Sequence, residues 1–307
     1  MTMQTSTQKN IQNLITEVIK SRRAKKIMLQ LPEGLKMNAA EIIDTLRENN
    51  IEAVLSGDAS FGACDIKDRE AKQAGCDLLV HVGHNKFYRD FDTAVPVLYF
   101  PWMIDAVIDK IDFSGINEHK IGLVTSVQHL HMLDEVSKRL ESASKEAVIG
   151  GQVLGCWTVN AERIKNDVDA FLFVGSGVFH PLGIETDKKV YVLDLETQKI
   201  RSVDMSLLEK KRYANIYNAK DAETFAILVS TKSGQRDLTG NAEKIASYLR
   251  ERDKKALILV MDEIKDEKLL GIKVDAFINT ACPRLMDDEW SKPFINANDV
   301  EKLFEDE

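Results

Sequence analysis

Internal repetition is the feature of this 307-residue sequence that most constrains its fold. Three segments, which begin at Lys25, His119 and Thr224, each open with an apolar strand-length run, pass through a small polar turn and enter an amphipathic helical pattern. A second strand, a short charged helix, a third strand and a fourth extended piece then follow in each copy. Apolar strands separated by helices are typical of parallel sheets covered on both faces. The sequence therefore predicts an α/β fold of three similar Rossmann-like parallel-sheet domains.

The repeats place the predicted domain boundaries at 1–114, 115–218 and 219–307. No stretch rich in Pro, Gly and Ser separates them, so we expect the domains to pack on one another in a pseudo-threefold arrangement. Parallel sheets of this kind bind ligands at the carboxyl ends of their strands. Functional residues are therefore expected at those ends.

Charge and hydropathy argue against several classes of function. The chain carries 41 Lys plus Arg against 49 Asp plus Glu, and this net charge of −8 disfavours direct binding to nucleic acid. No apolar run approaches the ~20 residues that a membrane helix needs. The polar N-terminus lacks the apolar core of a secretory signal. We therefore expect a cytoplasmic protein with no membrane partner.

Three of the four cysteines occupy matching places in the repeats. Cys64 and Cys156 follow the second predicted strand of their repeats, and Cys282 follows the third strand of the last repeat, each among small residues. Pseudo-threefold packing would bring these strand ends to one point. Cys76 instead precedes a strand and is interpreted as a small core residue. For each cysteine taken singly, burial in the core is the alternative, because free cysteine is among the most buried residue types.

A convergent set of thiols indicates a metal centre. Cysteines of intracellular proteins are normally reduced, and the absence of a CxxC pair excludes a compact local metal motif. Thiolates with no histidine beside them in sequence favour zinc or an iron–sulfur cluster. Structural zinc is nearly always four-coordinate, so a zinc site is the less favoured alternative. Three cysteine ligands would leave one iron of a cubane cluster open, which indicates catalysis.

Six short segments, spread in order over all three repeats, carry a resemblance to a known family. Together they resemble the archaeal-type enzyme of the first step of diphthamide biosynthesis, 2-(3-amino-3-carboxypropyl)histidine synthase. As a set they are highly specific for that family. The segments are LPEGL (31–35), GDASFGACD (57–65), GQVLGCW (151–157), FVGSGVFHPLG (173–183), STKSGQR (230–236) and NTACPRL (279–285).

The resemblance implies both a cofactor and a reaction. Members of that family are homodimers in which three cysteines hold a 4Fe-4S cluster with S-adenosylmethionine at the open iron. An external reductant supplies one electron, a 3-amino-3-carboxypropyl radical forms, and methylthioadenosine is left. The radical adds to a histidine of translation elongation factor 2. Carried over by motif, the cluster ligands are Cys64, Cys156 and Cys282, and no catalytic residue beyond them is assigned.

The loop after the third strand of the second repeat is a candidate for binding S-adenosylmethionine. Gly175, Ser176 and Gly177, followed by His180, form a predicted turn whose N–H groups could meet a carboxylate or a ribose. A plain turn or helix entry is the alternative.

Other candidate contacts to S-adenosylmethionine come from the first and third repeats. Ser233 and Gln235 supply donors, and Arg236 or Arg284 could pair with the methionine carboxylate. An interdomain salt bridge is the alternative for the arginines. Glu33 could anchor the substrate amine or, as the alternative, act as an anion at the following helix N-terminus.

Three aromatic or imidazole residues flank the same strand ends. His81 and His84 lie on either side of Gly83, and a hydrogen-bonded structural role is the favoured interpretation of each. Trp157 could shield a cluster at Cys156 from water, or simply pack.

Two other functions fit the same cysteine pattern. A quinolinate-synthase-like lyase also uses three α/β repeats with one cluster cysteine each, and its open iron acts as a Lewis acid. A non-catalytic partner subunit that carries a cluster is the other. The segments 31–35 and 230–236 favour the diphthamide family.

Overall fold

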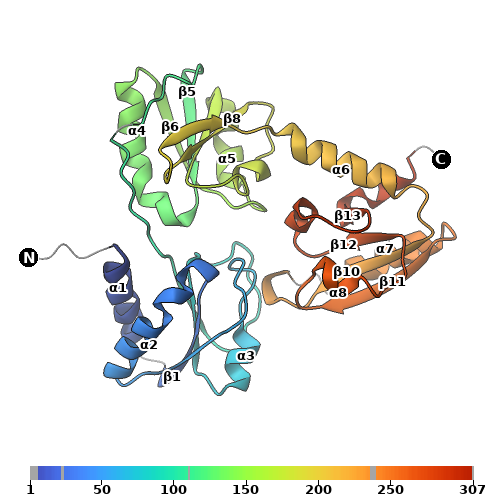
Figure 1. Cartoon of the computed structure of the whole chain (residues 1–307), viewed down its shortest axis with the longest axis horizontal. Helices are drawn as coiled ribbons and strands as arrows, with labels where there is room; N and C mark the ends of the chain where they lie inside the picture. Colours follow the sequence, from blue (N-terminus) through green and yellow to red (C-terminus); the bar gives the residue numbers. More distant parts are fainter. Residues whose placement is uncertain (1–5, 22–23, 110, 236–239, 306–307) are drawn as a thin grey trace, which may run out of the picture. The chain divides into compact units, whose positions relative to one another are not determined.

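The structure, a computed structural model of the chain, describes residues 6–21, 24–109, 111–235 and 240–305. Its contacts divide the chain into two compact units, residues 1–203 and 204–307. The first unit holds two of the sequence repeats and the second holds the third. Each unit consists of parallel-dominated sheets with helices packed on their faces (Figure 1).

The first repeat forms a four-stranded sheet in which all neighbouring strands are parallel, with the order β2-β1-β3-β4. Helices α1 and α2 cover one face of this sheet and α3 covers the other (Figure 1). The elements of this repeat are α1 (Ser6–Lys20), β1 (Lys26–Gln30), the 3-10 helix η1 (Glu33–Asn38), α2 (Ala39–Glu48), β2 (Glu52–Leu55), α3 (Asp68–Gln73), β3 (Leu78–Val82) and β4 (Val97–Phe100).

The second repeat has the same strand order, extended by one strand that the sequence did not predict. Its sheet runs β6-β5-β7-β8-β9, and β9 pairs antiparallel with β8 at the edge. The elements are β5 (Lys120–Thr125), η2 (Val127–Met132), α4 (Leu133–Ser142), β6 (Glu146–Gln152), α5 (Val159–Ile164), η3 (Lys165–Asp167), β7 (Ala170–Val174), η4 (Pro181–Gly183), β8 (Lys189–Asp194) and β9 (Lys199–Ser202).

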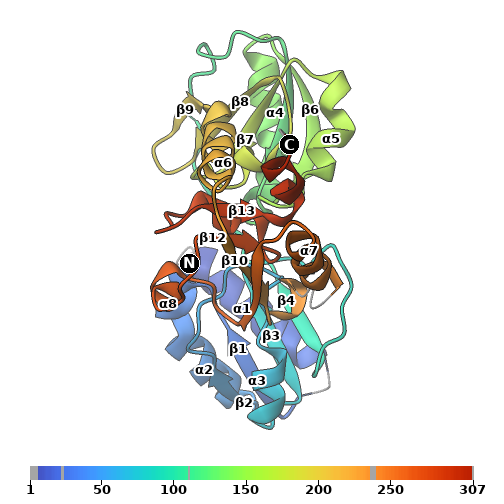
Figure 2. The same ribbon diagram turned by 90° about the vertical axis from the view of Figure 1, so that its right-hand side faces the viewer.

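The second unit repeats the parallel order as β11-β10-β12-β13. Figure 2 labels β10, β12 and β13 of this sheet together with α7 and α8. Its elements are α6 (Ser206–Asn218), β10 (Thr224–Ser230), η5 (Ser233–Gln235), α7 (Gly240–Arg250), β11 (Lys255–Met261), α8 (Asp266–Leu269), β12 (Ala276–Asn279), η6 (Pro283–Asp287), β13 (Phe294–Asn296) and η7 (Ala297–Leu303). The predicted fold class, α/β with parallel sheets in three similar repeats, is confirmed.

One boundary differs from the sequence-based division. The sequence assigned residues 206–218 to the second repeat, but this segment is α6, which packs in the second unit. Arg212 Nε donates to Asp299 Oδ2 at 2.7 Å, and the amide of Phe294 donates to Asn215 Oδ1 at 3.1 Å. These contacts anchor the helix to η7 and β13. The three-domain division itself stays a prediction, since contacts group the first two repeats together.

Alternating side chains of the central strands fill cores on both sheet faces. Ile27 and Leu29 of β1 pack in the cluster under α1 and α2, whereas Met28 packs in the cluster under α3. Residues of β10 alternate between two clusters in the same way. Because successive strand residues point to opposite faces, a continuous apolar run builds both cores at once. Among the described residues, none of the helices has both the length and the apolar character required to cross a bilayer.

An aspartate just before the third strand ties together the start of the sheet in every repeat. Asp77 Oδ2 accepts from the amides of residues 25 and 26 at 3.1 Å, and Asp169 Oδ2 accepts from residue 120 at 2.8 Å. Asp275 Oδ2 accepts from residues 223 and 224 at 3.1 and 2.8 Å. The carboxylate satisfies the first amides of the central strand, which have no partner in the sheet. The same carboxylate contact thus fixes the start of the central strand in all three repeats.

The helix that follows the central strand of each repeat (α2, α4 and α7) ends in the same way. Asn50, Ser144 and Asp253 adopt left-handed backbone conformations, with φ of 61°, 61° and 58°. The following amide in each case bonds back to a leucine carbonyl in the last turn, at 3.0 Å. This arrangement satisfies helix carbonyls and turns the chain into the second strand.

The aspartates that precede the third strand of each repeat should each stabilise their own sheet. We expect Asp169→Ala and Asp275→Ala to lower the free energy of unfolding by about 1 kcal/mol, because the strand amides lose a charged acceptor but stay near water. Urea denaturation measures the loss. Asp275→Asn keeps an acceptor oxygen and should lose less. An unchanged midpoint for the alanine variants would contradict this role.

Candidate functional site

Cys64 lies in a loop between β2 and α3 that closes on itself. The amide of Asp65 donates to the carbonyl of Gly62 at 2.9 Å, and the amide of Phe61 donates to Asp65 Oδ2 at 3.4 Å. Cys64 itself is half-buried and forms no disulfide. The loop therefore presents the thiol from a folded turn rather than from an extended segment.

A buried glutamine at the end of β1 hydrogen-bonds to the backbone of this loop. Gln30 Nε2 donates to the carbonyl of Asp65 at 2.7 Å, and Gln30 Oε1 accepts from the amide of Lys67 at 3.2 Å. One side chain thus fixes the backbone on the C-terminal side of Cys64. Lys67 is also buried, and its ammonium group lies 3.6 Å from a carboxylate oxygen of Asp58.

Two histidines extend the glutamine contact into a buried chain of hydrogen bonds. His81 of β3 is the register partner of Gln30, and its Nδ1 lies 2.9 Å from Gln30 Oε1. His81 Nε2 lies 2.9 Å from His84 Nδ1. Because Gln30 Oε1 can only accept, we assign the His81 proton to Nδ1, so that Nε2 accepts from His84.

Burial keeps these groups uncharged. It lowers the pKa of His81 to about 3, with the neighbouring His84 adding to the effect, and lowers the pKa of His84 to about 4. Tyr99 of β4, the register partner of His81, is half-buried near Asp68 and Cys64, and the loss of solvent around it raises its pKa to about 12. A row of neutral polar side chains therefore crosses β1, β3 and β4 beside the Cys64 loop.

Cys156 lies at the exposed tip of a tight turn after β6. The turn closes through two backbone hydrogen bonds, from Leu154 N to Trp157 O at 2.8 Å and from Trp157 N to Leu154 O at 3.2 Å. A Cβ atom on Gly183 would lie 2.3 Å from the carbonyl oxygen of Gly155, so the two chain segments touch there. Only glycine at 183 permits this close approach.

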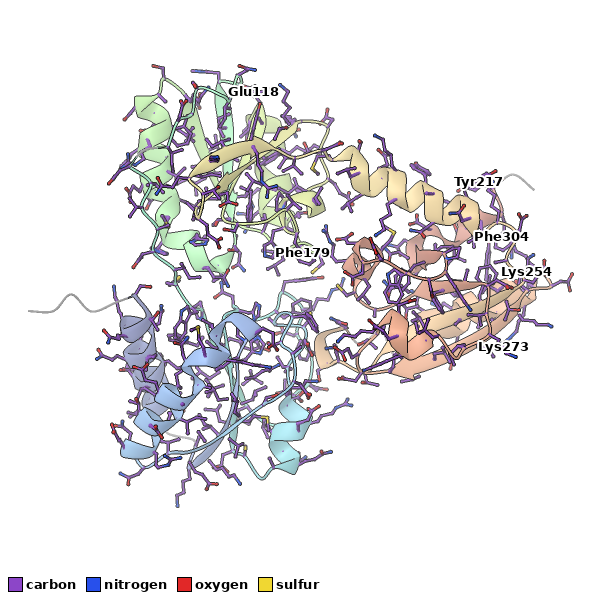
Figure 3. All side chains as sticks on the ribbon, in the orientation of Figure 1. Glu118, Phe179, Tyr217, Lys254, Lys273 and Phe304 are labelled. Atoms are coloured by element: carbon purple, nitrogen blue, oxygen red, sulfur yellow. The ribbon has the colours of Figure 1, made fainter. Side chains whose placement is uncertain are left out.

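The loop after β7 packs on this cysteine turn. A Cβ atom on Gly155 would lie 2.7 Å from the ring of Phe179, a half-exposed side chain labelled in Figure 3. His180 contacts the rings of Phe179 and Phe173, with centroid distances of 5.2 and 5.8 Å. The predicted binding loop of the second repeat is thus part of the structure that holds Cys156.

Side chains of the loop after β3 in the first repeat contact the Cys156 segment of the second repeat. The rings of Tyr88 and Trp157 stack with centroids 5.8 Å apart and planes 16° apart. Asn85 Nδ2 donates to Gln152 Oε1 at 2.7 Å, which joins the same two segments a second time. The loop after β3 therefore supports the Cys156 turn through two side-chain contacts within the first unit.

Cys282 is held by a carboxamide in the second unit. Asn279, the last residue of β12, donates from Nδ2 to the carbonyl of Cys282 and to Asn296 Oδ1, both at 2.8 Å. Its Oδ1 accepts from the amide of Ala281 at 3.0 Å. Cys282 is half-buried and directly precedes η6, whose first residue is Pro283. The arrangement is the counterpart of Gln30 beside the Cys64 loop.

The predicted cysteines therefore all occupy loops near strand carboxyl ends. Cys64 and Cys156 belong to the first unit and Cys282 to the second. Within the part of the chain that the structure describes, no three His, Cys, Asp or Glu side chains form a group able to hold a metal ion. Convergence of the three thiols at one point stays a prediction. Cys76 is buried in the core, and burial raises the pKa of its thiol, as expected of an unreactive cysteine.

The two glycines of the predicted binding loop after β7 adopt backbone conformations that favour glycine. Gly175 and Gly177 have φ of 144° and 78°, values that side chains rarely adopt. Ser176 lies exposed between them. The turn was predicted, and its N–H groups stay candidates for ligand binding.

The other predicted contacts to S-adenosylmethionine have varied surroundings. Ser233 and Gln235 form η5, directly after β10, and Arg236 lies outside the described residues. Arg284 is buried and forms an ion pair with Asp287 at 2.5 Å, within one helix. Glu33 is exposed and pairs with Lys36 Nζ at 2.6 Å. Lys36 also donates to the carbonyl of Gly57, so Glu33 supports the start of the Cys64 loop.

Sequence reasoning missed four residues that shape the site, namely Gln30, Asn279, Tyr88 and Gly183. A signal existed for the two carboxamides, since each ends an apolar strand with a polar residue. Gly183 lay inside a recognised segment without an assigned role. No local signal marked Tyr88, because its partner lies in another repeat.

Fold and site together define an α/β protein of three repeats that presents one loop cysteine from each repeat. The family model for putative diphthamide synthesis proteins matches residues 31–307. The chain belongs to this family. It is 37% identical to the 2-(3-amino-3-carboxypropyl)histidine synthase of Pyrococcus horikoshii, over 94% of this chain and 88% of that protein.

Solved structures of a relative agree. The crystal structure of Dph2 from Pyrococcus horikoshii matches with a TM-score of 0.86 and 35% identity, over 97% of this chain and 91% of that one. Dph2 from Pyrococcus horikoshii with a 4Fe-4S cluster matches with a TM-score of 0.84 and 36% identity, over 95% of this chain and 89% of that one.

The contact of Gly183 with the Cys156 turn predicts a selective defect. We expect Gly183→Ala to displace the Gly155 carbonyl and to lower iron incorporation several-fold on reconstitution, as measured by iron per chain. Gly115→Ala is the matched control, because a Cβ atom there meets nothing within 4 Å. Equal iron content in the two variants would contradict the proposed role of the close approach.

The buried histidine pair predicts a pH-dependent stability. Since the folded pKa values of His81 and His84 lie below the ordinary value of 6.5, the unfolded chain binds more protons as pH falls from 6.5 towards 4. Stability should therefore fall over this window, by up to about 1.4 kcal/mol per pH unit for each imidazole. Urea denaturation between pH 6.5 and 5 measures the slope. His84→Asn should flatten it, whereas the exposed His119→Asn should leave it as in the wild type.

Proposed function

We propose that the chain is a 2-(3-amino-3-carboxypropyl)histidine synthase that catalyses the first step of diphthamide synthesis. It would transfer the 3-amino-3-carboxypropyl group of S-adenosylmethionine to a histidine of translation elongation factor 2. The observation that carries the proposal is the placement of Cys64, Cys156 and Cys282 on loops near strand ends in a chain similar throughout to the Pyrococcus synthase.

The donor set fits a 4Fe-4S cluster as the cofactor. Cys64 and Cys282 are partly accessible and Cys156 is exposed, whereas Cys76 is buried. Soft thiolates are the ligands that iron–sulfur clusters use. When bound, the cluster supplies the electron that opens a carbon–sulfur bond of S-adenosylmethionine.

The surrounding residues would hold the thiols and control water. Gln30 and Asn279 fix the backbone beside Cys64 and Cys282, and the Tyr88–Trp157 stack covers one side of the Cys156 turn. His81 is uncharged, so it places no positive charge beside the Cys64 loop. These features preorganise the ligands before the cofactor arrives.

The S-adenosylmethionine site would be built from the flanking loops. The N–H groups of Gly175, Ser176 and Gly177 are suited to a carboxylate or ribose, with His180 beside them. Ser233 and Gln235 would add polar contacts from η5. The predicted contacts of Glu33, Arg236 and Arg284 belong to the same proposal, although the ion pairs of Glu33 and Arg284 favour supporting roles.

The proposed partners follow from the reaction. Elongation factor 2 is the protein substrate, an external one-electron reductant is required, and the enzyme acts as a homodimer in the cytoplasm. Direct contact with nucleic acid or membrane is not part of the proposal. Both alternatives, the Lewis-acid lyase and the non-catalytic subunit, predict no cleavage of S-adenosylmethionine by the purified chain.

Cysteine variants test the proposed function directly. We expect anaerobically reconstituted protein, reduced with dithionite, to release methylthioadenosine and modify elongation factor 2. Alanine at Cys64, Cys156 or Cys282 should lower both activities at least a hundredfold, because a cluster ligand is lost. Cys76→Ala is the matched control and should stay active. A cluster-loaded wild type that leaves S-adenosylmethionine intact would contradict the proposal.

A further inference from the structure

Ser60 carries a buried hydroxyl group for which the described protein offers no partner. It lies in the Cys64 loop, is 8% exposed, and its Oγ forms no hydrogen bond with any described residue. Burial of a hydroxyl without a partner is unfavourable, and folded proteins satisfy nearly all such groups. An unsatisfied group of this kind therefore indicates a missing acceptor or donor.

The loop does not need the Ser60 hydroxyl for its own shape. The amide of Phe61 and the amide of Asp65 are satisfied inside the loop, and the carbonyl of Asp65 accepts from Gln30. The loop conformation is thus fixed by other groups. What remains is a donor placed close in sequence to Cys64 and shielded from water.

The sulfur of Cys64 lies near Gly62, two residues after Ser60 on the same loop. A Cβ atom on Gly62 would lie 3.6 Å from Cys64 Sγ, and among the described residues no other atom beyond its chain neighbours would lie within 4 Å. The sulfur and the Cβ position of Gly62 are therefore neighbours within the loop that contains Ser60. A group bound at this sulfur would be held by the same loop that carries the unsatisfied hydroxyl.

We infer that the Ser60 hydroxyl donates a hydrogen bond to a sulfur atom of the cluster held by Cys64, and that it thereby raises the reduction potential. This inference rests on the proposed function. Hydrogen bonds to cluster sulfurs tune the potential, because a donor stabilises the more negative, reduced state. Ser60 is a tuning and positioning residue, since it acts on the cofactor rather than on the substrate.

The test compares Ser60→Ala with Ser56→Ala, which removes the same atom from an equally buried serine at the start of the same loop. Iron and sulfide per chain, the midpoint potential from an EPR-monitored redox titration, and the melting temperature of the cluster-free protein are measured for both and for the wild type. We expect Ser60→Ala to take up the cluster, with a potential lower than that of the wild type and of Ser56→Ala. The cluster-free Ser60→Ala protein should melt no lower than the wild type, because it loses no hydrogen bond.

Three results would overturn the inference. A potential for Ser60→Ala equal to that of the wild type, with the cluster intact, would leave the proposed function standing and remove the role of Ser60. A lower melting temperature of the cluster-free variant with an unchanged potential would assign the hydroxyl to protein or water contacts instead. A wild type that takes up no cluster would overturn the inference and the proposed function together.

Discussion

Buried carboxamide groups hold the chain beside two of the three cysteines, and the rest of the candidate site depends on them. Gln30 and Asn279 each end a central or neighbouring strand and reach over the sheet edge to a backbone carbonyl of a cysteine loop, at 2.7 and 2.8 Å. Because these carbonyls and amides are buried, losing a partner costs about 1–3 kcal/mol. The sheet therefore transmits its rigidity to the loops, and the thiols are positioned before any cofactor binds.

Gln30 is itself held by a chain of hydrogen bonds through His81 and His84. Both imidazoles stay neutral because burial disfavours their charged forms. A neutral chain can donate and accept hydrogen bonds without changing the charge near Cys64. In the second repeat, close contact replaces the carboxamide, since Gly183 lies directly against Gly155 and the Tyr88–Trp157 stack covers the turn. Different local chemistry thus achieves the same result, a cysteine on a supported loop.

The sequence predicted the fold class, the strand that opens each repeat and the place of each cysteine, because period and apolar character report directly on burial. It assigned α6 to the second repeat, whereas contacts group this helix with the second unit, since a helix between two repeats carries no local sign of its packing partner. It missed β9, an exposed edge strand with little apolar character. Tyr88 could not be assigned because its role depends on Trp157, a residue of another repeat. Contacts of this kind arise from packing and leave no periodic pattern.

The central claim is that Cys64, Cys156 and Cys282 jointly hold one cluster with an open iron. Mössbauer spectroscopy of protein reconstituted with isotopically enriched iron tests it most directly. The account predicts a 4Fe-4S spectrum in which a single iron site changes when S-adenosylmethionine is added, while the cysteine-bound sites do not. A spectrum in which no site responds, or one from a centre that survives alanine at any of the three cysteines, would contradict it.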